Sequence, residues 1–173
     1  MSKFRAIVSA LTLSTVALGG TATIATVALG GTATIAAAKD PEVIIKITRV
    51  RALDQPDAFS KGDFYAKATI NGETIATKPV KQETSITPDW VISKKVKPGT
   101  VNVKLAVFDK DVSVDDPIDI NRIDNKRDID FTVNTKTCKI EGFSSTYKCG
   151  AKITRAGKEK KGAEITFIVM VKK

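Results

Sequence analysis

The sequence predicts an all-β protein, an antiparallel sandwich of two sheets with about eight strands. Apolar residues alternate with polar ones in most segments after Glu42, and a period of two is typical of strands with one buried face. An Asn71-Gly72 pair, the strongest short hairpin signal, stands between two such segments. No segment has a clear helical period, and short strands separated by turn residues are typical of a β-sandwich.

The strands follow from this alternation in chain order. Val43, Ile45 and Ile47 share one face of the first strand, and Pro98-Gly99 provides the turn before the fifth. Counting the cysteine hairpin as one unit, the predicted strands cover residues 43–47, 64–70, 75–80, 90–96, 101–107, 129–133, 138–149 and 165–171.

Two basic stretches are predicted to be solvated surface. Residues 155–162, RAGKEKKG, are interpreted as an exposed loop. Lys94, Lys95 and Lys97 lie beside a predicted strand, and their simplest interpretation is its solvated face and not a dedicated binding patch.

Residues 1–38 are predicted to be a signal peptide, with one domain over residues 39–173. Lys3 and Arg5 precede a long uncharged stretch that ends in three alanines, which fits a secretory signal cleaved after Ala38. The element TVALGGTATIA occurs at 15–25 and again at 26–36, which we interpret as a duplication within the signal. An uncleaved membrane anchor is the alternative, although glycine and threonine drive insertion poorly.

Export agrees with the cysteine content. Cys138 and Cys149 are the two cysteines of the chain, and they flank a predicted hairpin with its turn near Gly142. In an oxidising compartment such a pair is expected to form a disulfide. A zinc site is excluded because the chain has no histidine to complete it, and the C-x-x-C spacing of redox sites is missing.

Composition restricts the classes of function. The chain has 173 residues and a formal charge of +9, which favours adsorption to anionic polymers or membrane surfaces but is also common in lysine-rich solvated domains. The absence of histidine removes the commonest general base and the Ser-His and Cys-His nucleophile pairs.

Aspartates gather in two predicted loops. If both loops lie at one end of the sandwich, their carboxylates converge. Negative charges at such a short distance repel one another unless a cation lies among them. Ca²⁺ is the expected ion, because it accepts about six to eight oxygen ligands in loose geometry, whereas Mg²⁺ demands a tighter octahedron. The aspartates of the two loops are Asp54, Asp57, Asp63, Asp109, Asp111, Asp115, Asp116 and Asp119.

Two other interpretations of the aspartates differ in strength. Aspartate favours turns, where it caps its own backbone, and this explains a single loop aspartate without any metal. An EF-hand starting at Asp109 is excluded, because it requires glycine where Val114 stands and glutamate where Ile120 stands.

The stretch from Glu42 to Asp119 resembles the C2 domain. The segments RVRALDQPDAFSKGDFYAKATING, TPDWVISKKV and VNVKLAVFDKDVSVDDPI are similar to the family's pattern of a first-loop aspartate, an Asp-Pro-Tyr strand start, an Asn-Pro-x-Trp and an Asp-x-Asp. Trp90 matches the structural tryptophan, whereas Phe64 replaces the proline. After Asp119 the match fades, so the disulfide hairpin is interpreted as an elaboration of a C2-like sandwich.

The resemblance implies a set of Ca²⁺ ligands and a way of docking. In C2 domains the ion bridges loop carboxylates and the phosphates of anionic phospholipid, and Asp115 is able to replace Asp116 as a ligand. The implied ligands are Asp57 and Asp63 from the first loop and Asp109, Asp111, Asp115 and Asp116 from the third.

We therefore expect a secreted or periplasmic, monomeric Ca²⁺-binding module that docks on an anionic membrane surface or an acidic polymer such as a glycan. No nucleic-acid partner is expected, and a protein partner is left open. The first alternative is a structural or interaction sandwich of the cell envelope with a degenerate, calcium-free site. An enzyme is not expected: Ser60-Lys61 and Ser93-Lys94 are adjacent pairs whose side chains point to opposite faces of a strand, which leaves metal-assisted hydrolysis at the aspartates.

Overall fold

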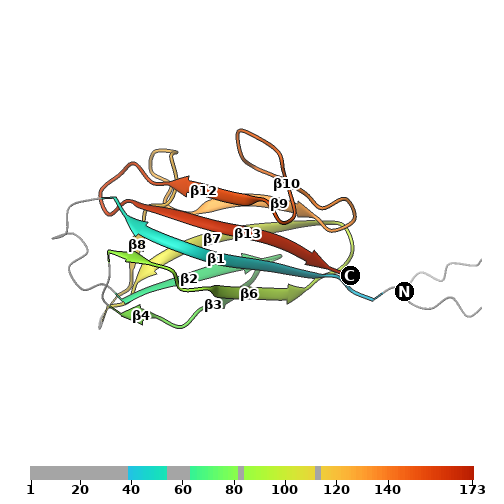
Figure 1. Cartoon of the computed structure of the whole chain (residues 1–173), viewed down its shortest axis with the longest axis horizontal. Coiled ribbons are helices and arrows are strands. Elements are labelled where there is room, and N and C mark those ends of the chain that lie inside the picture. The colour runs from blue at the N-terminus through green and yellow to red at the C-terminus, as the bar shows by residue number, and fades with distance from the viewer. Residues whose placement is uncertain (1–38, 54–62, 82–83, 112–113) are drawn as a thin grey trace, which may run out of the picture. The chain divides into compact units, whose positions relative to one another are not determined.

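The chain forms the predicted two-sheet sandwich in a computed structural model that describes residues 39–53, 63–81, 84–111 and 114–173 (Figure 1). No helix occurs in these residues. The strands are β1 (Glu42–Ala52), β2 (Asp63–Ile70), β3 (Glu73–Ala76), β4 (Val80–Lys81), β5 (Ser85–Ile86), β6 (Trp90–Lys95), β7 (Thr100–Asp109), β8 (Asp116–Ile118), β9 (Ile129–Asn134), β10 (Lys139–Glu141), β11 (Tyr147–Lys148), β12 (Lys152–Ala156) and β13 (Ala163–Lys172).

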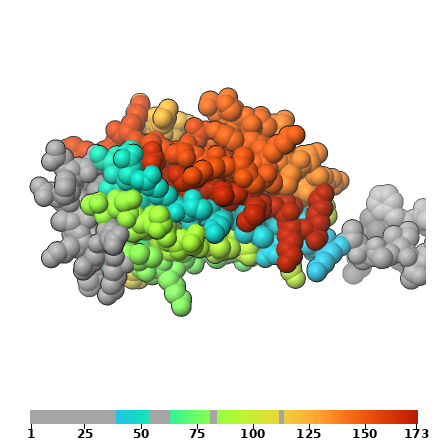
Figure 2. Space-filling model, in the orientation of Figure 1, coloured from blue at the N-terminus to red at the C-terminus, as the bar shows by residue number. Residues whose placement is uncertain are grey.

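The first sheet is organised around β1. Its order is β12-β13-β1-β5, and β6 pairs with the first half of the same edge of β1. β1 and β13 run antiparallel along their whole length, from Glu42 opposite Lys172 to Ala52 opposite Ala163. Figure 2 shows this order on the viewed face, where the red and orange atoms of β13 and β12 lie beside the cyan band of β1 and the yellow-green band of β6.

The second sheet is organised around β7. Its order is β11-β10-β9-β7-β2-β3, with β4 paired to β2 and β8 paired to the last residues of β7. All pairings between these strands are antiparallel. The start of β2, the end of β7 and the start of β8 therefore lie at the same end of this sheet.

The core fills the space between the sheets, as the alternation predicts. Val43, Ile45 and Ile47 of β1 are fully buried, and the odd-numbered residues of β7 from Val101 to Val107 face them from the other sheet. Trp90 is also buried in this core, in agreement with its structural role. Burial of these apolar side chains is the main force that holds the two sheets together.

The predicted Asn-Gly turn is confirmed. Asn71 has φ 47° and Gly72 has φ 84°, and two consecutive positive φ angles are what a tight hairpin turn of the favoured hand requires. The turn places β3 directly beside β2, with Ile70 opposite Glu73.

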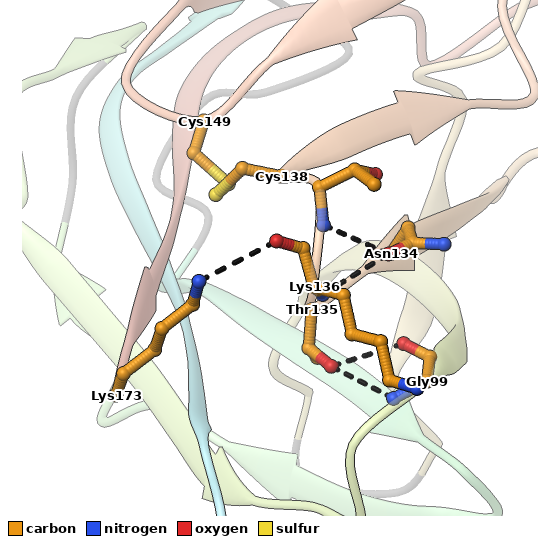
Figure 3. The surroundings of a disulfide bond; sticks show 8 residues. Gly99, Asn134, Thr135, Lys136, Cys138, Cys149 and Lys173 are labelled. Carbon is orange, nitrogen blue, oxygen red and sulfur yellow. Dashed lines mark hydrogen bonds between the residues drawn. A yellow bond between two sulfur atoms is a disulfide. The ribbon is translucent and has the colours of Figure 1, made fainter.

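The disulfide hairpin is also confirmed. Cys138 and Cys149 are bonded, with their Cα atoms 5.3 Å apart, and β10 and β11 pair between them. Figure 3 shows the backbone N–H of Cys138 donating to Asn134 at the end of β9. A side chain at Gly142, in the turn, would put its Cβ 2.8 Å from both Asp130 O and Phe131 Cα, so a glycine is needed where the hairpin crosses β9.

Three short strands are absent from the sequence prediction, and one predicted loop is partly wrong. β5, β8 and β12 are too short or too polar to produce a clear alternation. The sequence predicts an exposed loop over residues 155–162, but Arg155 and Ala156 belong to β12, and Gly162 is buried where it bridges to Asp119. The loop is therefore residues 157–161, and it is anchored to the domain.

Several predictions fall outside the described residues. These concern the signal peptide over residues 1–38, the first-loop aspartates Asp54 and Asp57, and the Ser60-Lys61 pair. Within the part of the chain that the structure describes, no helix has the length and apolar character needed to cross a membrane.

The disulfide is expected to contribute about 3 kcal/mol to the free energy of unfolding, because it closes a loop with a sequence separation of 11. Replacing both cysteines by alanine should lower the urea midpoint accordingly, and the m-value should stay the same or rise slightly, because the unfolded chain loses its cross-link. Reductant should lower the midpoint of the original protein by the same amount and leave the double variant unchanged. An original protein that is equally stable with and without reductant would contradict this expectation.

Candidate metal site at the aspartate loops

Three of the predicted ligands lie side by side at one end of the second sheet. Asp63 begins β2, Asp109 ends β7 and Asp116 begins β8. In the strand register, Asp109 stands opposite Asp116 on one side and opposite Phe64, the neighbour of Asp63, on the other. Strand pairing therefore brings together Asp63 and Asp109, which are 46 positions apart in the chain.

Asp109 is the centre of this group. Its Oδ1 accepts a hydrogen bond from the backbone N–H of Asp63 at 2.7 Å, and the backbone N–H of Lys110 donates to the carbonyl oxygen of Asp63 at 3.0 Å. Partial burial raises the pKa of Asp109 above its ordinary value, and the negative charges of Asp111, Asp63 and Asp116 raise it further. The hydrogen bond from Asp63 acts in the opposite direction and only partly offsets them.

Three carboxylates of the cluster around Asp109 have no paired cation among the described residues. Asp63, Asp109 and Asp111 form no ion pair there. The atoms that these three side chains offer to a metal ion are all carboxylate oxygens, and Ca²⁺ prefers oxygen ligands of this kind. However, no group of three or more His, Cys, Asp or Glu side chains in residues 39–53, 63–81, 84–111 and 114–173 is arranged to hold a metal ion.

Asp115 contacts the outer face of the sheet, next to the backbone of Asp111, which donates a hydrogen bond to its carboxylate. Its carboxylate accepts a hydrogen bond from the hydroxyl of Tyr65, and Lys67 Nζ lies 3.9 Å from it. The Tyr65 hydrogen bond is the main cause that lowers the pKa of Asp115, and burial is the main cause that raises the pKa of Tyr65. Lys67 also covers the stacked rings of Tyr65 and Phe108. Asp115 thus belongs to a polar and aromatic cluster on the outer face of the sheet.

Asp116 has a lysine partner that the sequence does not predict. The ammonium group of Lys161 contacts its Oδ2, and both side chains are more than 40% exposed. This contact neutralises the carboxylate of Asp116. Because exposed ion pairs contribute little stability and exchange readily with other ions, another cation can still bind to the group around Asp109.

A buried aspartate holds Lys161 in place. Asp119 is 1% exposed, and its Oδ2 accepts hydrogen bonds from the backbone N–H groups of Lys158 and Glu159 at 2.8 Å each. The loop passes so close that a Cβ at Gly157 would lie 2.1 Å from the Asp119 carbonyl oxygen. Asp119 is therefore structural: it fixes the loop 157–161, which carries Lys161 to Asp116.

Sequence reasoning misses Lys161 and the separate position of Asp115 for different reasons. Lys161 lies in a loop with other basic residues, and nothing in that stretch distinguishes it from its neighbours. Asp115 lies just before β8, and its partner Tyr65 comes from β2, so no local pattern indicates its position.

The fold is that of C2 domains. A structure described as a C2 domain superimposes with a TM-score of 0.52 at 15% sequence identity, over 77% of this chain and 99% of that chain. A pair of C2 domains from extended synaptotagmin 2 gives a TM-score of 0.50 at 15% identity, over 86% of this chain and 47% of that chain. A longer chain of the same protein, which adds its SMP domain to the two C2 domains, gives 0.50 at 13% identity, over 77% and 27%.

These similarities confirm the C2-like architecture and extend no further at such low identity. This chain spans less than half of either extended synaptotagmin chain. No protein-family model and no curated protein sequence matches it.

The raised pKa of Asp109 predicts a specific dependence of stability on pH. Because the folded-state pKa lies above the ordinary 3.8, the unfolded chain releases this proton at a lower pH than the folded one. The free energy of unfolding therefore falls as pH rises from 3.8, and the loss is complete above the folded-state pKa. Asp109→Asn removes the charge and keeps an acceptor for the Asp63 N–H. Without divalent cations, we expect this variant to unfold at a higher temperature than the original protein at neutral pH and at a similar one below about pH 3.

Thermal melting monitored by circular dichroism across this pH range measures the difference. Glu141→Gln is the matched control, because Glu141 is an exposed carboxylate of the hairpin that pairs with Lys139. A variant that is less stable than the original protein at neutral pH would show that the Asp109 charge stabilises the fold, contrary to this account.

Proposed function

We propose that this protein is a Ca²⁺-dependent docking module that attaches to an anionic surface, a phospholipid membrane or an acidic glycan, through its aspartate loops. The observation that carries the proposal is the position of Asp109, which strand pairing places beside Asp63 and opposite Asp116. Burial and the charges of Asp111, Asp63 and Asp116 raise its pKa, and of these carboxylates Asp116 alone has an ion-pair partner in the described residues. A divalent ion that binds there would relieve this repulsion. The C2-like fold is consistent with such a role and does not establish it.

The candidate ligands are the carboxylates that the strand register gathers. Asp63, Asp109 and Asp111 would hold the ion, Asp116 would join them after release from Lys161, and Asp57 would contribute from outside the described residues. Bound Ca²⁺ supplies positive charge at the loop end that phosphate or carboxylate groups of a surface can share. Asp115 is left out of this set because Tyr65 and Lys67 hold it on the outer face.

Export belongs to the same proposal. The segment 1–38 would direct secretion, and the Cys138–Cys149 disulfide supports an oxidising compartment such as the periplasm or the cell exterior. Calcium is abundant outside the cell, so even a weak site with a Kd of about 10⁻⁴ to 10⁻³ M would be filled. N-terminal sequencing of the exported protein would begin at Lys39 if Ala38 is the cleavage site, and at Met1 or Ser2 if the segment is a retained anchor.

A second candidate function is a calcium-independent interaction domain. The contact between Lys161 and Asp116 favours it, because an internal ammonium group already neutralises one of the implied ligands. In this case the aspartate end is a polar surface, and the partner is a protein or an anionic polymer that binds through the basic surplus of the chain.

Calcium titration of the melting temperature separates the two candidates. For a site that binds Ca²⁺ in the folded state alone, we expect the melting temperature to rise with Ca²⁺, by the equivalent of about 2.7 kcal/mol at 100 times Kd. Asp109→Asn should abolish this rise, and Glu141→Gln should leave it unchanged. The same Ca²⁺ dependence should appear in co-sedimentation with phosphatidylserine vesicles and be absent with neutral phosphatidylcholine vesicles.

Lys161 provides the sharper comparison. If its ammonium group competes with Ca²⁺ for Asp116, Lys161→Met should tighten Ca²⁺ binding about two- to fivefold, the range expected for an exposed ion pair. Lys160→Met removes a neighbouring exposed charge and should leave the affinity nearly unchanged. No melting-temperature change at millimolar Ca²⁺ in any of these proteins, together with vesicle binding that is lost in high salt, would reject the calcium proposal in favour of the second candidate.

A further inference from the structure

A cavity of about 340 Å³ opens between the disulfide hairpin, the segment after β8 and the edge strand β12. It lies in the part of the chain where the C2 resemblance has faded. Apolar side chains of Ile120, Ile129 and Phe143 line it, together with the cationic groups of Arg122 and Arg155. This combination of an apolar lining and basic groups is a feature of sites for small anionic molecules.

Arg155 is the most unusual of these residues. It lies on the same face of β12 as Ile153, which is fully buried, so its side chain projects toward the space between the sheets at their edge. There the guanidinium group lies over the ring of Phe143, 4.5 Å from its centroid. Among the described residues Arg155 forms no ion pair, so its N–H groups are left without a carboxylate partner while the guanidinium group rests on the Phe143 ring.

The charges around the cavity do not cancel. Lys126, which also lines it, pairs with Asp130 at 2.5 Å. Arg122 is exposed and, like Arg155, makes no ion pair within the described part of the chain. Two guanidinium groups therefore remain uncompensated, and a guanidinium group pairs in two-point geometry with carboxylate and phosphate oxygens.

The walls of the cavity are held by contacts that do not involve a ligand. Phe143 packs edge-on against Tyr147 and lies near Phe167, and the Cys138–Cys149 disulfide closes the hairpin that carries it. On the opposite side, the backbone N–H of Lys126 donates to the carbonyl oxygen of Ile123 at 3.2 Å, and both residues line the cavity. A site whose walls are already in place loses less entropy when a ligand binds.

We propose that this cavity binds a small molecule or terminal group of about monosaccharide size that carries an oxyanion, a carboxylate or a phosphate, held by Arg122 and Arg155 with its body against the apolar lining. The volume is at the lower end of the range of about 300 to 1,000 Å³ for small-molecule sites. This inference does not depend on the calcium proposal, because the two sites share no residue.

The experiment is an NMR titration of the folded protein in calcium-free buffer without a chelator, observing the arginine Nε–H signals. The probes are glucuronate, which carries a carboxylate, glucose 6-phosphate, which carries a phosphate, and glucose as the neutral control. We expect the Arg122 and Arg155 signals to shift saturably with at least one anionic probe and not with glucose. The stronger of the two anionic probes then identifies the source of the oxyanion.

Substitutions test the role of each arginine. Arg122→Gln and Arg155→Gln should each weaken binding about tenfold, the loss of a charge-assisted hydrogen bond. Lys152→Gln, which removes an exposed charge from the start of the same strand, should leave the affinity unchanged. Arg122 is exposed, so its variant keeps the test valid if Arg155→Gln perturbs the hairpin. Absence of saturable shifts at millimolar concentrations of both anions, or equal weakening by Lys152→Gln, would overturn the proposal.

Discussion

Burial of two alternating apolar faces against each other is the constraint on which the rest of this structure depends. β1 and β7 lie inside their sheets, and their inward side chains meet in one core. A shift of one residue in either strand would turn its apolar face to solvent, so the register is strongly specified. That register sets Asp109 opposite Asp116 and beside the start of β2, and thus determines which acidic groups become neighbours.

The same register brings negatively charged side chains close together at the loop end, and a lysine from another loop neutralises one of them. Asp109 is surrounded by carboxylates, whereas Asp116 receives an ammonium group from a loop that a buried carboxylate, Asp119, holds in position. Asp119 and Asp109 therefore have opposite roles: the first fixes the backbone, and the second is the unrelieved centre of a charged group. If the Lys161 ammonium group competes with Ca²⁺ for Asp116, the apparent affinity for Ca²⁺ depends on the strength of both interactions.

The sequence allows much of the fold to be predicted, but only part of the candidate site. The alternation of apolar and polar residues predicts the long strands, and Asn71-Gly72 predicts the turn between two of them. Both signals can be read because they depend only on residues that are close together in the sequence. Cys138 and Cys149 predict their own bond because the hairpin between them is local. The partners of Asp115 and Asp116 depend on Tyr65 and Lys161, which come from distant segments, and pairing between distant side chains leaves no local pattern.

The most direct test of the account is the pKa of Asp109 itself, measured by NMR of its carboxyl carbon with and without Ca²⁺. Without divalent ions the account predicts a value above 3.8, raised by burial and by the neighbouring carboxylates. Millimolar Ca²⁺ should lower it, because a bound cation favours the ionised form, and the same ionic strength of KCl should not. A pKa that starts at or below 3.8, or that responds equally to the two salts, would contradict the central claim that these carboxylates form one site for a divalent ion.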